Sequence, residues 1–151
     1  MKADVTRSIQ QSGRLSLLEN AVLVTGGGRY GRGYVYADIP IDPRDWFFAC
    51  HFHEDPVMPG SLGVEAMLQA MQVYAREQGL GQPRSALPDQ TTTWKYRGQV
   101  PPERDKVTLE VHVSDVVAGS HITGDASLWR KDRRIYEVKG LGLQLAFSGI
   151  A

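Results

Sequence analysis

One segment of the sequence limits the possible folds more than any other, because it predicts a single long helix that is apolar on nearly every side. Residues 61–78 have helical character, and the breaker sequence GLGQP marks the end of the helix. The polar side chains before its last turn are Glu65, Gln69 and Gln72, whose i, i+4, i+7 spacing places them in one narrow stripe. A helix of this composition is buried, so Glu65 must face something particular.

Most of the remaining chain is typical of β-structure. Strands are predicted at residues 19–25, 34–41, 91–100, 106–117, 121–130 and 134–147. One long helix among about six strands favours an α+β fold in which an antiparallel sheet curls around the helix. The first 13 residues are polar and weakly patterned, so we expect residues 1–13 to be a loosely held lead-in and residues 14–151 to form a single domain.

Composition excludes several classes of function. The 151 residues, 42% of them hydrophobic, suffice for one domain with a sizeable core. Lysine plus arginine equals aspartate plus glutamate at 17 each, so no net field attracts nucleic acid or an anionic membrane. The single Cys50 excludes an intramolecular disulfide framework, and the N-terminal region lacks the apolar run of a signal peptide or membrane span. The expected setting is the cytoplasm.

The segment that leads into the helix carries the most specific motif. Residues 46–69, WFFACHFHEDPVMPGSLGVEAMLQ, resemble the active-site segment of the hot-dog β-hydroxyacyl-ACP dehydratases, the β-hydroxydecanoyl dehydratase/isomerase type in particular. The resemblance runs from about residue 17 to residue 147, and WKYRGQV and IYEVKGLGLQL are most similar to dehydratase domains of polyunsaturated fatty acid and polyketide-type synthases. It implies a hot-dog fold, with an antiparallel sheet wrapped around a long central helix. The implied reaction converts carrier-bound β-hydroxyacyl thioesters to trans-2-enoyl thioesters in fatty acid or polyketide-type biosynthesis.

The resemblance also assigns roles to individual residues. The family's catalytic histidine and helix carboxylate fall on His51 and Glu65. The backbone N–H of Gly60 matches the donor to the thioester oxygen, and the carbonyl of Val57 matches the group that holds the second histidine nitrogen. Gln69 lies one turn after Glu65, where it can hydrogen-bond the carboxyl and orient it.

The chemistry needs a base, an acid and a donor to the developing oxyanion. A neutral imidazole at His51 is a suitable base, because its unperturbed pKa of about 6.5 lies close to working pH. Glu65 on an apolar helix is suited to hold a proton as the acid, since desolvation favours the neutral carboxyl. We expect Ser61, Met67 and His53 to lie along the substrate tunnel.

Partners and cofactors follow from the same family. The reaction requires no metal and no dissociable cofactor, because the substrate is carried on the phosphopantetheine of an acyl carrier protein or carrier domain. Arg84 and Arg97 are candidates to meet its phosphate. The resemblance implies a homodimer, or pairing with a partner hot-dog domain, with the histidine and the acid of one site on different units. Glu65 replaces the aspartate of the isomerase type, so isomerisation is not predicted.

Other interpretations remain open at the level of sequence. Glu65 could be a structural ion-pair partner, with Arg97 as the candidate cation. His51 and His53, with two acids after them, could form a metal site, although further ligands at suitable spacing are missing. GGGRYG fits a dinucleotide fingerprint, but a strand follows it where a helix is required. The fold also suits a thioesterase, an enoyl-CoA hydratase or a non-catalytic synthase-derived domain.

Overall fold

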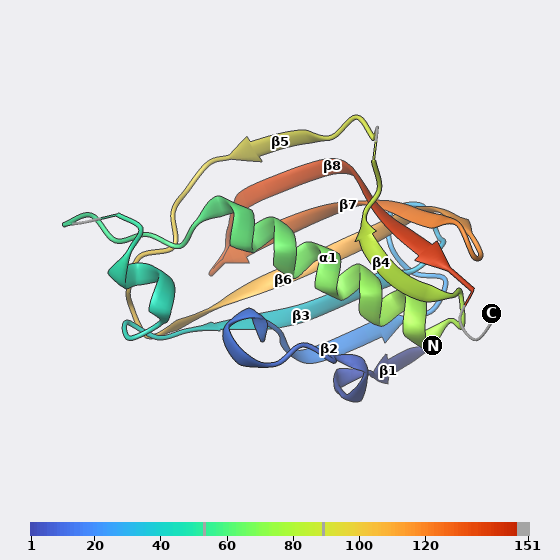
Figure 1. The fold of residues 1–151 in the computed structure, drawn as a ribbon, viewed down its shortest axis with the longest axis horizontal. Coiled ribbons are helices and arrows are strands. Elements are labelled where there is room, and N and C mark those ends of the chain that lie inside the picture. Colours follow the sequence, from blue (N-terminus) through green and yellow to red (C-terminus); the bar gives the residue numbers. More distant parts are fainter. Residues whose placement is uncertain (53, 89, 148–151) are drawn as a thin grey trace.

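A curved antiparallel sheet wraps around one long helix in the computed structural model, which describes residues 1–52, 54–88 and 90–147 (Figure 1). The helix is α1 (Gly60–Glu77). The strands are β1 (Lys2–Asp4), β2 (Glu19–Val24), β3 (Tyr34–Ile41), β4 (Gln82–Ala86), β5 (Thr93–Tyr96), β6 (Asp105–Val117), β7 (His121–Arg130) and β8 (Arg133–Ala146). Three short 3₁₀ helices complete the elements: η1 (Thr6–Ser8), η2 (Gly13–Leu15) and η3 (Trp46–Ala49). The predicted α+β class is confirmed.

The strands follow the order β1-β2-β3-β6-β7-β8-β4, and every pair is antiparallel. One face of β8 is shared by two strands, because β5 pairs with residues 136–139 and β4 with residues 143–146. The side of β5 that faces away from β8 is therefore an edge of the sheet among the described residues.

The core lies between the inner face of the sheet and α1. Along β6, buried and partly exposed residues alternate, so Leu109 and Val111 point inward while Glu110 and His112 point outward. From the helix, side chains such as Met67 are fully buried against this layer. The long apolar helix of the sequence is thus the centre of the core, as its composition predicts.

The helix ends as predicted but its neighbours differ from the prediction. Gly79 adopts a positive φ of 63°, and the N–H of Leu80 donates to the carbonyl of Ala75, which closes the last turn. The residues that follow form β4, a strand that the sequence did not indicate because glycines and a proline stand where a periodic pattern would be. The strand expected at residues 91–100 is shorter, with β5 limited to Thr93–Tyr96.

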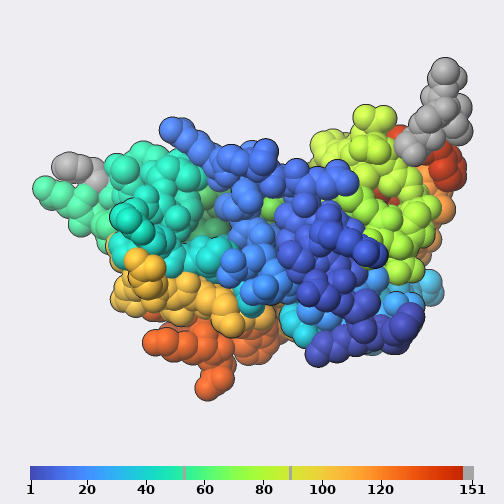
Figure 2. All heavy atoms as spheres, turned by 90° about the horizontal axis from the view of Figure 1, so that it is seen from below, coloured from blue at the N-terminus to red at the C-terminus, as the bar shows by residue number. Residues whose placement is uncertain are grey.

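The first 18 residues, here called the N-terminal segment, are held against the molecule rather than loosely. β1 pairs with β2, and the side chain of Val5 is only 1% exposed. Ser8 donates to Glu77 at 2.6 Å, and its carbonyl accepts from Arg76 at 2.9 Å. In Figure 2 these residues, in dark blue, cover the middle of one face of the molecule. The expectation of a loosely held lead-in at residues 1–13 is therefore wrong.

The N-terminal segment also covers the polar stripe of α1. Gln72 accepts a hydrogen bond from Gln11, and Gln69 donates to the carbonyl of Leu15 at 2.9 Å. The side of the helix that the sheet leaves open is thus covered within the same chain. An apolar helix wrapped by a single sheet does not, on this ground alone, need a second subunit to bury it.

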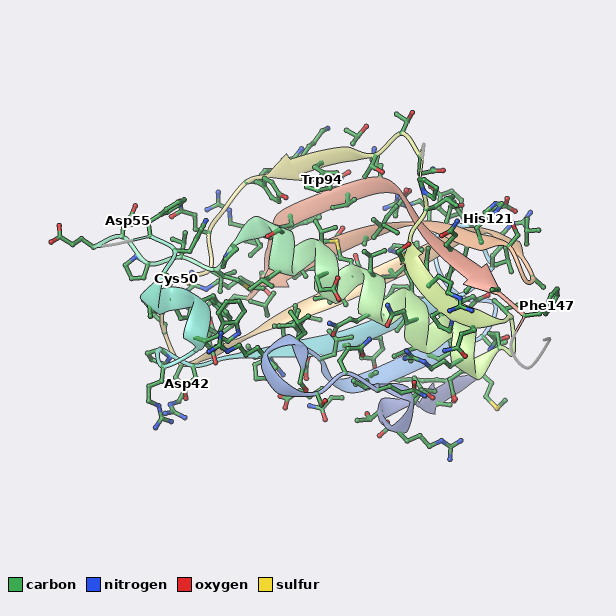
Figure 3. The ribbon with its side chains drawn as sticks, viewed as in Figure 1. Asp42, Cys50, Asp55, Trp94, His121 and Phe147 are labelled. Atoms are coloured by element: carbon green, nitrogen blue, oxygen red, sulfur yellow. The ribbon has the colours of Figure 1, made fainter. Side chains whose placement is uncertain are left out.

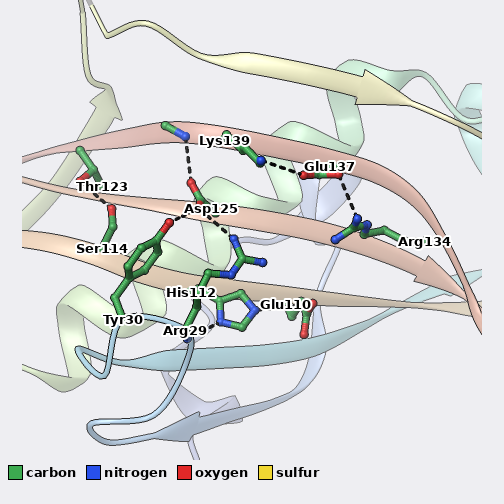
Figure 4. Close-up of polar contacts among 11 residues, drawn as sticks. Arg29, Tyr30, Glu110, His112, Ser114, Thr123, Asp125, Arg134, Glu137 and Lys139 are labelled. Carbon is green, nitrogen blue, oxygen red and sulfur yellow. Dashed lines mark hydrogen bonds and ion pairs between the residues drawn. The ribbon is translucent and has the colours of Figure 1, made fainter.

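The glycine-rich connection between β2 and β3 is fixed to the outer face of the sheet (Figure 4). The backbone N–H of Arg29 donates to Nδ1 of His112 at 2.9 Å, and its guanidinium pairs with Asp125 at 3.2 Å. Tyr30 donates to the same carboxylate, which also accepts from the N–H of Gly140 at 3.1 Å. GGGRYG is a structural loop between two strands, so the dinucleotide interpretation is wrong.

Among the residues that the structure describes, no helix has the length and apolar character required to cross a membrane.

Candidate active site

The segment between η3 and α1 projects from one end of the molecule, where Cys50 and Asp55 are labelled in Figure 3. Its two ends are anchored. Phe47 and Phe48 of η3 are buried in the core, and the N–H of Met58 donates to the carbonyl of Val100 at 2.9 Å. The loop can therefore present polar side chains at a fixed position next to the start of α1.

Val57 holds His51 through both its backbone and its ring. The N–H of Val57 donates to the carbonyl of His51 at 2.9 Å, and the imidazole Nδ1 lies 3.2 Å from the carbonyl oxygen of Val57. Because a carbonyl oxygen can only accept, Nδ1 must carry the proton. In the neutral ring Nε2 then has a free lone pair. The contact expected between His51 and the Val57 carbonyl is present in the structure.

Glu65 is partly buried on α1, and Gln69 fixes one of its oxygens. The amide nitrogen of Gln69 donates to the carbonyl of Leu15 at 2.9 Å and to Oε1 of Glu65 at 3.2 Å. The first bond sets the orientation of the amide, because Leu15 offers only an acceptor. Since Oε1 of Glu65 accepts a hydrogen bond, a proton on this carboxyl belongs on Oε2. Arg97 is exposed and forms no ion pair with Glu65 within the described residues, so the ion-pair alternative is not supported.

Gly60 is the first residue of α1, where backbone N–H groups have no acceptor within the helix and the helix dipole is positive. A Cβ at this position would lie 3.0 Å from the ring of Tyr96, so the ring packs directly against the glycine. Tyr96 in turn contacts Tyr136 with ring centroids 4.7 Å apart. Burial, with a smaller contribution from Tyr96, raises the pKa of Tyr136 to about 12. Two neutral tyrosines therefore border the helix N-terminus at physiological pH.

The structure places the predicted residues unevenly. His51, Val57 and Gly60 lie on one continuous segment, and Glu65 and Gln69 follow on the first turns of the helix. No hydrogen bond joins His51 to Glu65 among the described residues. The expected tunnel residues separate: Ser61 is exposed, Met67 is fully buried in the core, and His53 lies outside the described residues.

Three groups at the site were not predicted. They are the Leu15 carbonyl, which orients Gln69, and the two tyrosines, Tyr96 and Tyr136. A backbone carbonyl leaves no signal in a sequence, whereas Tyr96 lies inside the WKYRGQV stretch and could have been considered. A cavity of about 130 Å³ lies on the other side of this region, lined by Met58, Phe47 and parts of the N-terminal segment and β3.

In the part of the chain that the structure describes, no cluster of three or more histidine, cysteine, aspartate or glutamate side chains is arranged to hold a metal ion. His53, one of the candidate ligands from sequence, lies outside that part.

Comparison with known proteins agrees with the motif. The profile of the FabA-like domain family matches residues 10–139. One of the subunits of the polyunsaturated fatty acid synthase of Thraustochytrium sp. (strain ATCC 26185 / S-3) is 37% identical over 138 residues, which is 85% of this chain. The match spans only 9% of that relative.

Solved structures share the fold at low sequence identity. The dehydratase heterocomplex ApeI:P of Xenorhabdus doucetiae has a TM-score of 0.67 at 12% identity, covering 97% of this chain and 93% of that chain. Zebra fish thioesterase superfamily member 2 has a TM-score of 0.60 at 11% identity, covering 94% of this chain and 93% of its own. The profile covers most of the sequence, and the synthase relative shares well over a quarter of the aligned residues. The chain therefore belongs to the FabA-like domain family, with the hot-dog fold that its motif implied.

Proposed function

We propose that the chain dehydrates β-hydroxyacyl thioesters to trans-2-enoyl thioesters, with His51 as base and Glu65 as acid. The observation that carries the proposal is the hydrogen bond between Nδ1 of His51 and the carbonyl of Val57. This bond leaves Nε2 free to accept a proton, on a segment that ends at the N–H groups of α1. Membership of the FabA-like family supports the same reaction.

The proposed steps balance with these groups alone. Nε2 of His51 takes the proton next to the thioester carbonyl, and the electron pair moves toward the carbonyl oxygen. The Gly60 N–H and the positive end of α1 stabilise that oxygen. The pair then forms the new double bond and expels the β-hydroxyl, which takes the proton from Oε2 of Glu65 and leaves as water. Neither a metal nor a dissociable cofactor takes part in these steps.

The substrate and the partners belong to the same proposal. The acyl chain arrives on the phosphopantetheine of an acyl carrier protein or carrier domain, in the cytoplasm. The domain works as a homodimer, or beside a partner hot-dog domain, and the base and the acid of one site come from different units. The open edge of β5 supports this arrangement: Trp94 is 48% exposed, and Tyr96, 49% exposed, lies against Gly60.

Mass spectrometry of β-hydroxyacyl pantetheine and carrier thioesters of graded chain length tests the proposal. We expect loss of water with the thioester intact, and a product double bond only at the trans-2 position. Release of free thiol would identify a thioesterase and contradict the proposal. If no thioester changes in mass, the non-catalytic alternative is correct.

Variants of the catalytic pair test the assigned roles. His51→Ala and Glu65→Gln should each lower kcat by about 10²- to 10⁴-fold, because each removes one partner of the proton transfers. Their unfolding curves should resemble that of the parent. His121→Ala, at the opposite end of the molecule (Figure 3), and Glu77→Gln, at the far end of α1, are matched controls and should retain activity. Near-parental turnover in either catalytic variant would show that its role is wrong.

A further inference from the structure

A shallow pocket of about 480 Å³ opens where the β7–β8 turn meets the chain that leaves β5. Its lining consists of Gly98, Gln99 and Ile135 together with residues 130–133 of the turn. The turn has the sequence RKDR, so it contributes three cations and one acid to the wall of the pocket. In a chain with no net charge, this is a local concentration of positive charge.

Only one of the three cations is neutralised. Arg130 pairs with Glu103 at 2.7 Å and with Asp105 at 3.1 Å. Neither Lys131 nor Arg133 forms an ion pair with any residue that the structure describes. Asp132 offsets one of these two charges, so the pocket retains an excess of positive charge.

One of the unpaired cations is also held in position. A terminal nitrogen of Arg133 donates to the carbonyl of Arg97 at 2.9 Å. The guanidinium is therefore fixed beside the pocket, and its remaining N–H groups are available to a ligand. Lys131 occupies the turn itself with a φ of 57° and is exposed. A planar donor fork beside a point charge suits a phosphate group.

The pocket lies close to the candidate active site along the chain. Gly98 is two residues from Tyr96, whose ring packs on Gly60, and two residues from Val100, whose carbonyl holds Met58. Two residues of extended chain span no more than about 7 Å. The segment that borders the start of α1 therefore also forms one wall of the basic pocket.

We propose that this pocket binds the phosphate of the phosphopantetheine arm that delivers the acyl thioester. The inference rests on the proposed function, because it assumes a thioester substrate on that arm. The surrounding cations favour a single anionic group over a broad acidic surface, since Arg130 is paired with two acids, and Arg134 and Lys139 both pair with Glu137. What remains unpaired is the small set of donors that faces the pocket.

Steady-state kinetics with one β-hydroxyacyl group on three arms tests the inference: pantetheine, 4′-phosphopantetheine and coenzyme A. At low ionic strength the KM should be about tenfold lower for phosphopantetheine than for pantetheine, with equal kcat, as expected for a charge-assisted contact made outside the reacting atoms. Coenzyme A should match phosphopantetheine, because both present the same pantetheine phosphate. The advantage should shrink as salt is added.

The double variant Lys131→Gln, Arg133→Gln should lose the difference between the two arms while kcat on pantetheine is unchanged. The matched control is Arg7→Gln, Arg32→Gln, which removes the same charge from exposed sites on the N-terminal segment and the β2–β3 loop. An equal loss in the control would mean that overall charge, not the pocket, attracts the substrate. That outcome would overturn the inference.

Failure of the inference is distinguishable from failure of the proposed function. If pantetheine and phosphopantetheine thioesters are dehydrated with the same KM, the function stands and the pocket has no such role. A lower KM for coenzyme A alone would mean that the nucleotide is read, which also overturns the inference. If no thioester is dehydrated, NMR titration with free 4′-phosphopantetheine decides. Shifts confined to residues 98–99 and 130–133, absent with pantetheine, would support the phosphate site, and their absence would overturn it.

Discussion

Backbone carbonyl oxygens determine where the protons lie on both candidate catalytic side chains. The Val57 carbonyl requires a proton on Nδ1 of His51, and the Leu15 carbonyl requires the amide nitrogen of Gln69 on its side. Gln69 then donates to Oε1 of Glu65. A base with its lone pair on Nε2 and an acid with its proton on Oε2 are thus set by groups that take no part in the reaction.

Gln69→Met tests this orientation at the level of one residue. Methionine conserves the length of the side chain but cannot donate, so Glu65 loses its fixed orientation and the Leu15 carbonyl loses its partner. We expect kcat to fall about tenfold with little change in KM, and the free energy of unfolding to fall by about 1–3 kcal/mol.

Gln72→Met is the matched control, because Gln72 lies on the same stripe one turn later and bonds Gln11 instead of a catalytic group. It should lose some stability and keep kcat. A Gln69→Met enzyme with parental kcat would show that Gln69 serves only the fold.

At the scale of elements, the N-terminal segment acts as part of the fold. It adds β1 to the sheet, buries Val5 and contributes hydrogen bonds to the last turns of α1 through Ser8. Because Leu15 also belongs to it, the segment links the stability of the sheet edge to the orientation of Gln69.

Val5→Ala tests the attachment of this segment. The valine is 1% exposed, so its truncation should lower the free energy of unfolding by about 1–3 kcal/mol, measured by urea denaturation with an unchanged slope. Lys2→Ala, on the exposed strand β1, is the control and should change stability by less than about 0.5 kcal/mol. Equal stability of the two variants would mean that the segment contributes little to the fold.

The parts of the fold that sequence predicted are those with a periodic pattern. The helix and the strands β2, β3, β6, β7 and β8 were found within a few residues, because burial alternates along the strands and is continuous around α1. β4 and the N-terminal segment were missed for the opposite reason. β4 is mostly exposed and is held by backbone pairing to β8, and the segment attaches through carbonyls and one buried valine.

The same distinction applies to the candidate site. His51, Glu65, Val57 and Gly60 were found because a local motif contains them all. Tyr136 is 76 residues away from Gly60 in the chain, and only the folded sheet brings it, through Tyr96, to the start of the helix. Contacts of this kind depend on the register of β5 against β8, which the sequence does not state.

At the scale of the whole molecule, the open edge of β5 is the surface suited to a second subunit. The N–H of Arg97 donates to the carbonyl of Ile135, so in an antiparallel ladder the alternate residues Lys95 and Thr93 also face β8. The N–H groups of Trp94 and Tyr96 then point away from the sheet. A strand from a partner can pair with these groups and cover the two exposed aromatic side chains.

Mixing two inactive variants tests whether one site is shared between subunits. A dimer that combines one His51→Ala protomer with one Glu65→Gln protomer has one site in which base and acid are both intact, provided that they come from different chains. With random reassortment of equal amounts, half of the dimers are mixed and each has one good site of two, so activity should recover to about a quarter of wild type. Introducing Trp94→Pro into both variants removes an outward N–H and should suppress both dimerisation, measured by light scattering, and the recovery. Trp94→Ala retains the N–H and should reduce both less. Absence of recovery after demonstrated exchange of protomers, or full activity in a monomer, would instead require His51 and Glu65 to meet within one chain.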